Sequence, residues 1–280
     1  EFLFMNGVSM PTEEEQFEVY KRAAVICKDK VLTIRTLDIG GDKDIPYMGL
    51  TKESNPFLGY RAIRFCLGRI DVFTTQLRAI LRASAYGNIR IMLPLITGVS
   101  EVRSVRTILQ NVMRELDSKE IPYDKDILLG VMIETPAACM LADILAKEAD
   151  FFSIGTNDLT QYTIAVDRGN ENVAYLYSAF HPAVLRSVKR IIECAKRENI
   201  EVGMCGEAAG NPAMIPLLLA FGLDEFSVTA SKVLETRKNI ASWTMKEAAA
   251  VTDTVMGMST EKEVSAYLSD YIATKMSNGK

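Results

Sequence analysis

Residues 128–138 read LLGVMIETPAA and residues 151–162 read FFSIGTNDLTQY, and these two stretches decide the fold. Each begins with an apolar, strand-like run, passes into a short polar cluster and continues with helix-forming residues. Glu134 lies in the first polar cluster and Asp158 in the second. The carboxyl ends of neighbouring parallel strands open at the same edge of a sheet, so we expect both carboxylates to face one mouth. Such a pair suits a divalent cation beside an anionic substrate, and each is also consistent with a cap of the helix that follows.

The same alternation of strand and helix continues along most of the chain. We predict eight strands, each followed by helical residues, at residues 2–5, 31–39, 60–62, 89–95, 128–133, 151–154, 202–205 and 225–228. The first helix should open with a capping box, because Thr12 and Glu15 have that spacing. Eight strand and helix pairs predict an α/β fold, a closed (βα)8 TIM barrel. A doubly wound sheet is disfavoured because no glycine-rich fingerprint follows the first strand.

Length and composition favour one globular domain and exclude several classes of protein. The 280 residues, of which 48% are hydrophobic and 24% charged, fit a single barrel over residues 1–280 with a helical C-terminal end. A net charge of −4 gives no basic field for nucleic acid. The 5 cysteines are scattered without CxxC spacing, which disfavours a zinc site or a disulfide framework and favours the reducing cytoplasm. No apolar run approaches the roughly 20 residues that would insert into a membrane.

Other polar residues cluster after the predicted strands and are candidates for chemistry. Arg35, Arg61 and Arg168 are candidate phosphate contacts because a guanidinium matches phosphate oxygens, although surface ion pairs are the commoner role of such arginines. Asn157 precedes Asp158 where the chain leaves a strand, and is suited to an anion or to a simple turn. Cys205, between glycines, is a candidate proton donor. The remaining cysteines and the single histidine are expected to be structural: Cys27, Cys66, Cys139, Cys194 and His181.

Six motifs, in this order, resemble enzyme I of the bacterial phosphoenolpyruvate:sugar phosphotransferase system. They are TIRTLDIGGDK at 33–43, NPFLGYRAIR at 55–64, MIETPAA at 132–138, GTNDLTQ at 155–161, DRG at 167–169 and MCGE at 204–207. The resemblance runs from residue 1 to about residue 243. Any one of these motifs is weak, but six in register are specific.

The resemblance implies a (βα)8 barrel that binds phosphoenolpyruvate and Mg²⁺ and forms a homodimer. Carried over by motif, Glu134 and Asp158 look like the Mg²⁺ ligands, and the backbone around Asn157 and Asp158 is expected to receive the substrate carboxylate. The side chains of Arg35, Asn157 and Arg168 look like phosphate contacts, with Arg61 close by. Cys205 is similar to the general acid of the family, which protonates the enolate carbon as pyruvate forms.

The implied activity is that of a phosphoenolpyruvate-protein phosphotransferase, which performs the first step of sugar uptake. The phosphoryl group passes to a histidine of an N-terminal domain and from there to the phosphocarrier protein HPr. This sequence does not contain the phosphohistidine motif, and His181 does not match it. An active-site arginine that precedes the corresponding segment in the family is also outside it. We therefore expect a piece of a longer polypeptide, which binds substrate and lacks complete phosphotransfer.

Two other functions remain open at this point. Pyruvate phosphate dikinase and phosphoenolpyruvate synthase have a C-terminal barrel with similar GTND and CGE motifs, although the stretches at 11–17 and 38–43 favour enzyme I. A non-catalytic module that senses phosphoenolpyruvate and dimerises is the second alternative. The retained Glu134, Asp158 and Cys205 argue against a lost active site.

Overall fold

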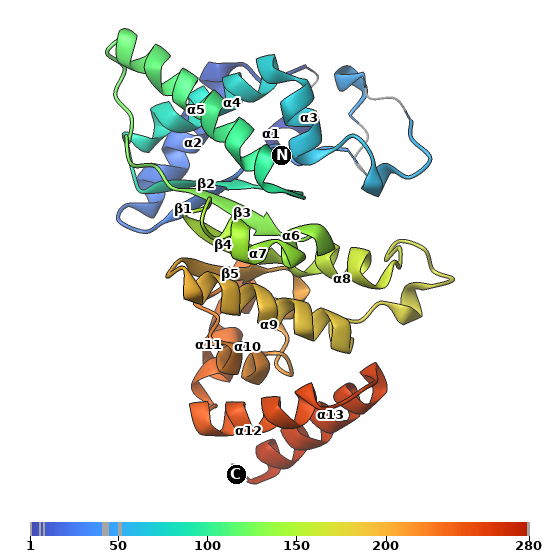
Figure 1. The fold of residues 1–280 in the computed structure, drawn as a ribbon. Coiled ribbons are helices and arrows are strands. Elements are labelled where there is room, and N and C mark those ends of the chain that lie inside the picture. Colours follow the sequence, from blue (N-terminus) through green and yellow to red (C-terminus); the bar gives the residue numbers. More distant parts are fainter. Residues whose placement is uncertain (1, 6, 8, 41–44, 50–51, 279–280) are drawn as a thin grey trace. The chain divides into compact units, whose positions relative to one another are not determined.

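The structure is a computed structural model of the chain, shown in Figure 1. It describes residues 2–5, 7, 9–40, 45–49 and 52–278, with only the backbone at residues 2, 46 and 276–278. Two compact units are present, and each is described by itself. Unit 1 runs as far as Met132 and takes in Glu148–Asp150, and unit 2 consists of Ile133–Lys147 and the chain from Phe151 onward. The end of the DIGGDK motif, from Gly41 to Lys43, lies outside the described residues.

Unit 1 contains three parallel strands. They are β1 (Leu32–Arg35), β2 (Ile89–Leu93) and β3 (Leu129–Ile133), whose last residue falls in unit 2. Leu32 lies opposite Ile89, and Ile91 lies opposite Leu129. All of β3 and most of β2 are buried, which explains their nearly continuous apolar sequence. The predicted strands at 31–39, 89–95 and 128–133 are therefore confirmed, although the first ends at Arg35 and covers less than half of its predicted range.

The helices of unit 1 pack against one another beside these strands (Figure 1). They are α1 (Phe2–Met5), α2 (Glu13–Cys27), α3 (Ala62–Gly68), α4 (Ile70–Ser84) and α5 (Val99–Ser118), with short 3₁₀ turns η1 (Pro46–Met48) and η2 (Pro56–Leu58). The capping box is confirmed: Thr12 Oγ1 accepts from the Glu15 N–H at 3.2 Å, and Glu15 Oε2 accepts from the Thr12 N–H at 2.8 Å. It satisfies backbone donors that the first turn of α2 would otherwise leave open.

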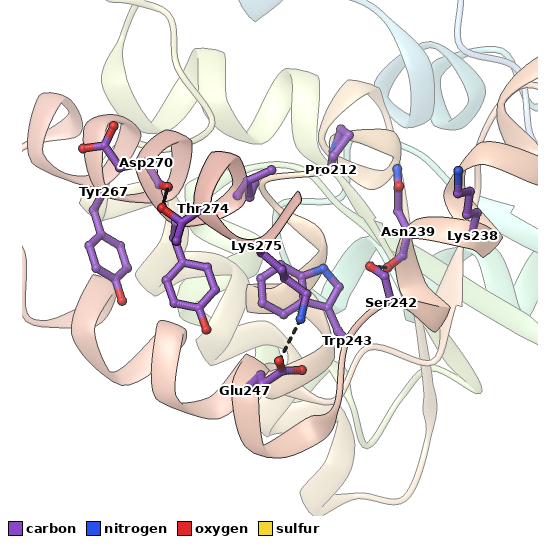
Figure 2. Close-up of a pocket in the computed structure, with 12 residues that line it drawn as sticks. Pro212, Lys238, Asn239, Ser242, Trp243, Glu247, Tyr267, Asp270, Thr274 and Lys275 are labelled. Atoms are coloured by element: carbon purple, nitrogen blue, oxygen red, sulfur yellow. Dashed lines mark hydrogen bonds and ion pairs between the residues drawn. The ribbon is translucent and has the colours of Figure 1, made fainter. Parts of the chain in front are cut away.

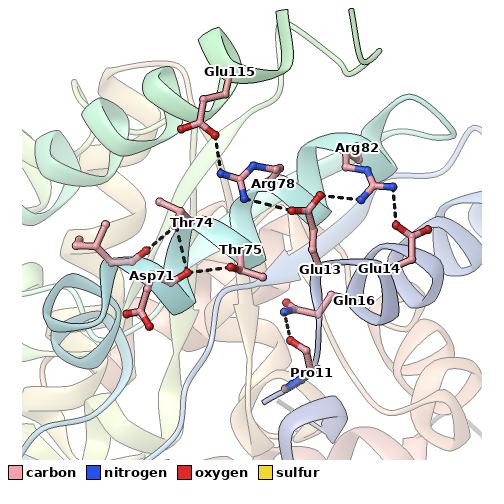
Figure 3. A network of polar contacts seen from close by, with 11 residues as sticks. Pro11, Glu13, Glu14, Gln16, Asp71, Thr74, Thr75, Arg78, Arg82 and Glu115 are labelled. Carbon is pink, nitrogen blue, oxygen red and sulfur yellow. Dashed lines mark hydrogen bonds and ion pairs between the residues drawn. The ribbon is translucent and has the colours of Figure 1, made fainter. Parts of the chain in front are cut away.

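Two arginines of α4 connect three helices of unit 1, as Figure 3 shows. Arg78 reaches Glu13 of α2 at 3.2 Å and Glu115 of α5 at 2.6 Å. Arg82 reaches Glu13 at 2.7 Å and Glu14 at 2.8 Å. Because these side chains are only partly buried, the network fixes the register of the helices more than it stabilises them.

Two of the eight predicted strands are wrong. Residues 2–5 form helix α1, with Phe4 buried and its carbonyl accepting from the Tyr47 hydroxyl. A short apolar run does not distinguish a strand from a buried helical turn. At residues 60–62, Arg61 is extended, but Ala62 takes a left-handed φ of 51° and begins α3. The Ala62 N–H donates to the Ile39 carbonyl at 3.2 Å, but residues 60–62 are not part of a strand.

Unit 2 also contains three parallel strands, which confirm the predictions at 151–154, 202–205 and 225–228. They are β4 (Phe151–Gly155), β5 (Glu201–Cys205) and the short β6 (Glu225–Phe226). Gly155 lies opposite Cys205, and Gly203 lies opposite Glu225. The end of β4 is thereby aligned with the end of β5, where both polar clusters begin.

Helices surround the strands of unit 2 and continue to the end of the described chain. They are α6 (Pro136–Met140), α7 (Ala142–Leu145), α8 (Thr156–Ile164), α9 (Pro182–Arg197), α10 (Ile215–Phe221), α11 (Val233–Ala241), α12 (Met245–Met256) and α13 (Glu261–Asn278), with 3₁₀ turns η3 (Ala174–Leu176), η4 (Glu207–Gly210) and η5 (Ala230–Lys232). The central helix α9 packs against β4, β5, α6, α7 and α8. No helix in the described ranges is both long and apolar enough to cross a membrane.

The fold is thus a parallel-sheet α/β fold, which confirms the predicted class at that level. The described residues contain six strands, three in each unit. The closed (βα)8 barrel with eight strands is not confirmed.

Candidate active site

The first part of the site is the junction of β4 and α8, where Thr156, Asn157 and Asp158 make up the first turn of the helix. Thr156 and Asp158 are buried, Asp158 to 7% exposure. A carboxylate in the first turn of a helix lies at the positive end of the helix dipole, which is an electrostatically favourable position. The predicted junction of strand, polar cluster and helix is present here.

The end of β5 lies against this junction and brings Cys205 to it. Thr156 Oγ1 donates to the Cys205 carbonyl at 2.9 Å, and Asn157 Oδ1 accepts from the Glu207 N–H at 3.3 Å. Gly206, between them, has a left-handed φ of 92°. A Cβ on this glycine would lie 2.4 Å from Thr156 Oγ1, so only glycine permits the approach. The structure therefore brings two predicted site residues, Asn157 and Cys205, to one place.

The Cys205 thiol is half-buried and hydrogen-bonded within unit 2. Its Sγ lies 3.6 Å from the Ile154 carbonyl, to which it donates, and accepts from the Ser153 hydroxyl at 3.8 Å. A thiol that donates to a carbonyl carries its proton, as a general acid must before reaction.

Arg168 lies on the loop between α8 and α9 and contacts the start of α8. Its Nη1 is 3.5 Å from Asp158 Oδ1, and its backbone N–H donates to Gln161 Oε1 at 3.1 Å. The Arg168 side chain is 37% exposed, so its guanidinium is accessible to an anion from solvent. The structure thus joins Arg168 to the predicted cluster of Asn157, Asp158 and Cys205.

Glu134 enters the same unit directly before α6. It is 3% exposed, and its neighbour Thr135 caps α6 by accepting from the Ala138 N–H at 3.1 Å. The N-cap residue of α6 is therefore Thr135. Because α6 packs against α8, Glu134 and Asp158 sit at the starts of two contacting helices.

The donor set suits a hard cation with further oxygen ligands. In the part of the chain that the structure describes, no three His, Cys, Asp or Glu side chains gather into a complete metal cage. Mg²⁺ does not require one, because it commonly binds one or two carboxylates together with substrate phosphate and water. Two buried carboxylates at the edge of the cluster therefore fit Mg²⁺ better than a metal that needs an all-protein cage.

The other two predicted arginines lie together in unit 1 and share a carboxylate. Asp38, which is 4% exposed, accepts from Arg61 Nη2 at 3.0 Å and lies 3.2 Å from Arg35 Nη1. The loop that carries Asp38 is fixed by buried Gln76 of α4, whose Oε1 accepts from the Leu37 N–H at 2.9 Å. Asp38 was not predicted as a site residue. The signal that could have found it is an acid three residues after an arginine in a strand-end motif.

Gly40 allows this cluster to form. It has a φ of 108°, and a Cβ there would lie 2.6 Å from the Arg61 Cβ. Gly40 is therefore required both for its backbone conformation and for the approach of Arg61.

The residues expected to be structural are structural in this fold. His181 is the N-cap of α9, where its Nδ1 accepts from the Ala183 N–H at 3.2 Å. Cys66, Cys139 and Cys194 are buried, and Cys27 is half-buried. Burial, together with the Asp38 carboxylate, raises the pKa of the Cys66 thiol to about 12. Such a thiol stays protonated and is unreactive at neutral pH.

A cavity of about 1040 Å³ lies at the helical end of unit 2 and contains none of the predicted site residues (Figure 2). Trp243 stacks on Tyr271 with ring centroids 5.8 Å apart, and Lys275 lies 4.4 Å from the Trp243 ring. Lys275 also pairs with Glu247 at 2.8 Å. These contacts connect the segment after α11 with α12 and α13, so we interpret them as holding the helical end together.

Comparison with known protein families identifies the family of this chain. Residues 1–245 match the family model of the PEP-utilising enzyme, PEP-binding domain. The chain belongs to this family. It is 50% identical over 268 residues to a phosphoenolpyruvate-protein phosphotransferase of Geobacillus stearothermophilus and 49% identical over 270 residues to that of Bacillus subtilis. The resemblance drawn from the six motifs is therefore confirmed.

The similarity covers nearly all of this chain and less than half of each relative. The alignment spans 96% of the chain in both cases, and 46% of the Geobacillus and 47% of the Bacillus protein. Among solved structures, a citrate lyase of Burkholderia xenovorans is similar with a TM-score of 0.47 and 16% identity, over 72% of this chain and 69% of that chain. The chain thus spans about half the length of its phosphotransferase relatives.

Proposed function

We propose that this chain binds phosphoenolpyruvate together with Mg²⁺ and delivers the phosphoryl group to a histidine on another domain, releasing pyruvate. The observation that carries the proposal is the cluster in unit 2, where Asn157, Asp158, Arg168 and Cys205 gather at the ends of β4 and β5. The family match and the names of the relatives support the substrate and the reaction class.

In the proposed reaction the bond between phosphorus and the enol oxygen breaks. The phosphoryl group passes to the histidine nitrogen, and the electron pair of the broken bond stays on the enolate. The Cys205 thiol then gives its proton to C3, which yields pyruvate and leaves a thiolate that is reprotonated from solvent. Arg168 and Asn157 stabilise charge on the transferring group, which is the main task of a protein in such transfers.

Glu134 and Asp158 would hold the Mg²⁺, and the backbone amides of α8's first turn would receive the substrate carboxylate. When bound, the metal supplies positive charge beside the phosphoryl and enolate oxygens. Both carboxylates are buried within unit 2, which limits competing water and keeps their oxygens in place.

By the family resemblance, Arg35, whose side chain is 32% exposed, would supply a further phosphate contact, with the buried Arg61 close by. Asp38 neutralises part of their charge and orients both guanidinium groups. In this proposal Asp38 does not touch the substrate and acts by holding the arginines ready.

The remaining parts of the proposal come from the family resemblance. They are the closed (βα)8 barrel, a single domain over residues 1–280, a homodimer, a cytoplasmic location, the N-terminal phosphohistidine domain as first acceptor and HPr as the next. Light scattering after gel filtration tests the homodimer directly.

The names of the relatives favour the sugar phosphotransferase system over the dikinase and synthase alternative. A purely sensory module is the other alternative. It needs no proton donor, so retention of Cys205 among hydrogen-bonding partners favours catalysis.

Calorimetric titration with phosphoenolpyruvate, with and without Mg²⁺, tests the site. Binding should require Mg²⁺ and be lost in Glu134→Ala. The control is Glu207→Ala, which removes an exposed carboxylate after β5 that is not a predicted ligand. Binding that needs no metal, or that survives the loss of Glu134, would contradict the assignment.

A further inference from the structure

Tyr177 lies next to the proposed phosphate contacts, and neither the motifs nor the family resemblance assigned it a role. It follows the 3₁₀ turn η3 (Ala174–Leu176) in the loop between α8 and α9. Its hydroxyl donates to the Asn157 carbonyl at 3.1 Å. Asn157 is the second residue of α8 and one of the predicted phosphate contacts. Tyr177 therefore contacts the site although it does not follow a strand.

Arg168, the other predicted phosphate contact of unit 2, lies close enough to the same phenol to act on it electrostatically. Burial raises the pKa of Tyr177, while the positive charge of the neighbouring Arg168 acts in the opposite direction. A phenol has one donor and two acceptor positions. It can therefore donate to the Asn157 carbonyl and accept from the Arg168 guanidinium at the same time.

The loop from Arg168 to Tyr177 is held on the start of α8 at three points. The Arg168 N–H donates to Gln161 Oε1 at 3.1 Å, the Arg168 guanidinium reaches Asp158 at 3.5 Å, and the Tyr177 hydroxyl reaches Asn157. The Tyr177 hydroxyl fixes the far end of this loop on Asn157, beside the Arg168 guanidinium. Removing it leaves the loop attached but takes one restraint from the Arg168 side chain.

A second tyrosine in the same turn shows that the contact is specific. Tyr175 is 81% exposed, whereas Tyr177 is half-buried. The two residues are separated by Leu176 alone, so both lie in the same loop. Tyr175 is therefore a matched control for the loss of a tyrosine hydroxyl from this loop.

We propose that Tyr177 is a positioning residue, whose hydroxyl holds the Arg168 guanidinium at the start of α8 so that Arg168 and Asn157 bind one phosphoryl group together. This inference rests on the proposed function and deepens it. Without the hydroxyl, Arg168 must be ordered when the ligand binds, which lowers affinity for ligands that carry a phosphoryl group. Ligands held only by the metal and the carboxylate contacts should be unaffected.

The test compares two ligands in wild type, Tyr177→Phe and Tyr175→Phe by calorimetry in the presence of Mg²⁺. Phosphoenolpyruvate carries a phosphoryl group, and oxalate is a planar carboxylate ligand without one. Tyr177→Phe should bind phosphoenolpyruvate about fivefold to tenfold more weakly, the effect of one lost hydrogen bond, and oxalate within about twofold of wild type. Tyr175→Phe should bind both ligands as wild type does.

A double-mutant cycle establishes whether Tyr177 acts through Arg168. In an Arg168→Gln background, Tyr177→Phe should have no further effect on phosphoenolpyruvate affinity, because the group that it positions is gone. Thermal melting of each variant shows that the fold is retained, since Phe keeps the ring.

Three results would overturn the proposal. They are unchanged phosphoenolpyruvate affinity in Tyr177→Phe, equal weakening of both ligands, and additive losses in the double mutant. The failure of the proposed function looks different, because wild type itself would then bind no phosphoenolpyruvate with Mg²⁺. In that case the positioning role falls with the function on which it rests.

Discussion

The two arginine clusters of this protein use the same pair of charges for different tasks. In unit 1, Arg61 and Asp38 lie 3.0 Å apart with side chains that are 8% and 4% exposed. In unit 2, Arg168 lies 3.5 Å from Asp158 and is 37% exposed. A buried pair at short distance is part of the framework, because removal of either charge leaves the other desolvated. A longer contact with an accessible guanidinium leaves the arginine able to turn to a ligand.

The largest expected effect breaks the buried pair of unit 1. Asp38→Ala should lower the free energy of unfolding by about 3 to 5 kcal/mol, because the buried Arg61 loses its carboxylate. Urea denaturation measures the loss. The control is Asp71→Ala in the same unit, whose carboxylate pairs with Arg69 at 2.7 Å but is 67% exposed. It should change stability by less than about 1 kcal/mol, despite the shorter distance. Equal effects of the two substitutions would show that burial does not decide the role of an arginine pair.

The next prediction concerns the chemistry of the unit 2 cluster. Cys205→Ser should keep phosphoenolpyruvate binding but slow proton transfer at C3 about 100-fold or more, because a hydroxyl is a much weaker acid than a thiol. The reverse step is measurable by itself, as exchange of the pyruvate methyl hydrogens in D₂O with Mg²⁺, followed by ¹H NMR. Cys27→Ser, the other half-buried cysteine, is the control and should exchange at the wild-type rate. Wild-type exchange in Cys205→Ser would remove the general-acid role.

The polar residues at the strand ends could be predicted because the pattern of apolar and polar residues in the sequence marks where each strand ends. An apolar run of about five residues that ends in a polar cluster gives both a buried parallel strand and the residues at its carboxyl end. Glu134, Asn157, Asp158 and Cys205 were found in this way, and unit 2 brings the last three together. The prediction of a strand at residues 2–5 was wrong, because four apolar residues without a polar cluster after them do not distinguish a strand from a helical turn.

Asp38 and Tyr177 could not be predicted because their roles depend on contacts between distant parts of the chain. Asp38 is joined to Arg61 across a loop and two 3₁₀ turns, and no sequence period connects them. Tyr177 lies in an irregular loop, where two tyrosines of similar sequence context differ only in what they contact. The residues proposed to act on the substrate follow the strand pattern, and the residues proposed to hold them in position do not.

A third prediction tests the glycine that the unit 2 cluster requires. Gly206→Ala should destabilise the protein by about 2 kcal/mol, because a methyl group there meets Thr156 Oγ1 at 2.4 Å and φ is 92°. It should also weaken phosphoenolpyruvate binding, since Asn157 must move. Gly257→Ala is the control, because its φ is −84° and the nearest atom to an added Cβ is 3.5 Å away. Thermal melting and calorimetry give the two readouts, and a stable Gly206→Ala with normal binding would contradict the close packing of β5 on α8.

The smallest expected effect comes from a half-buried pair at the helical end of unit 2, which sharpens the distinction between distance and burial. Lys275 lies 2.8 Å from Glu247, closer than the buried Arg61 lies to Asp38. The hydrogen bond from Lys275, with those from Thr244, lowers the pKa of Glu247 from 4.5 to about 2. A depressed carboxyl pKa contributes stability above pH 4.5, and that contribution is lost as the pH falls towards 2.

Melting temperatures measured between pH 6 and pH 2.5 test this in wild type and Glu247→Gln. Other carboxylates protonate in both proteins, so the difference between the curves isolates Glu247. The wild type should be slightly more stable above about pH 5, and the two curves should converge as Glu247 protonates at lower pH. Parallel curves would mean that Glu247 has the same pKa folded and unfolded. The convergence of the two curves should be small, whereas Asp38→Ala should lose much stability. That result would establish that burial from water, and not the distance between the charges, determines how much the Asp38 cluster stabilises the protein.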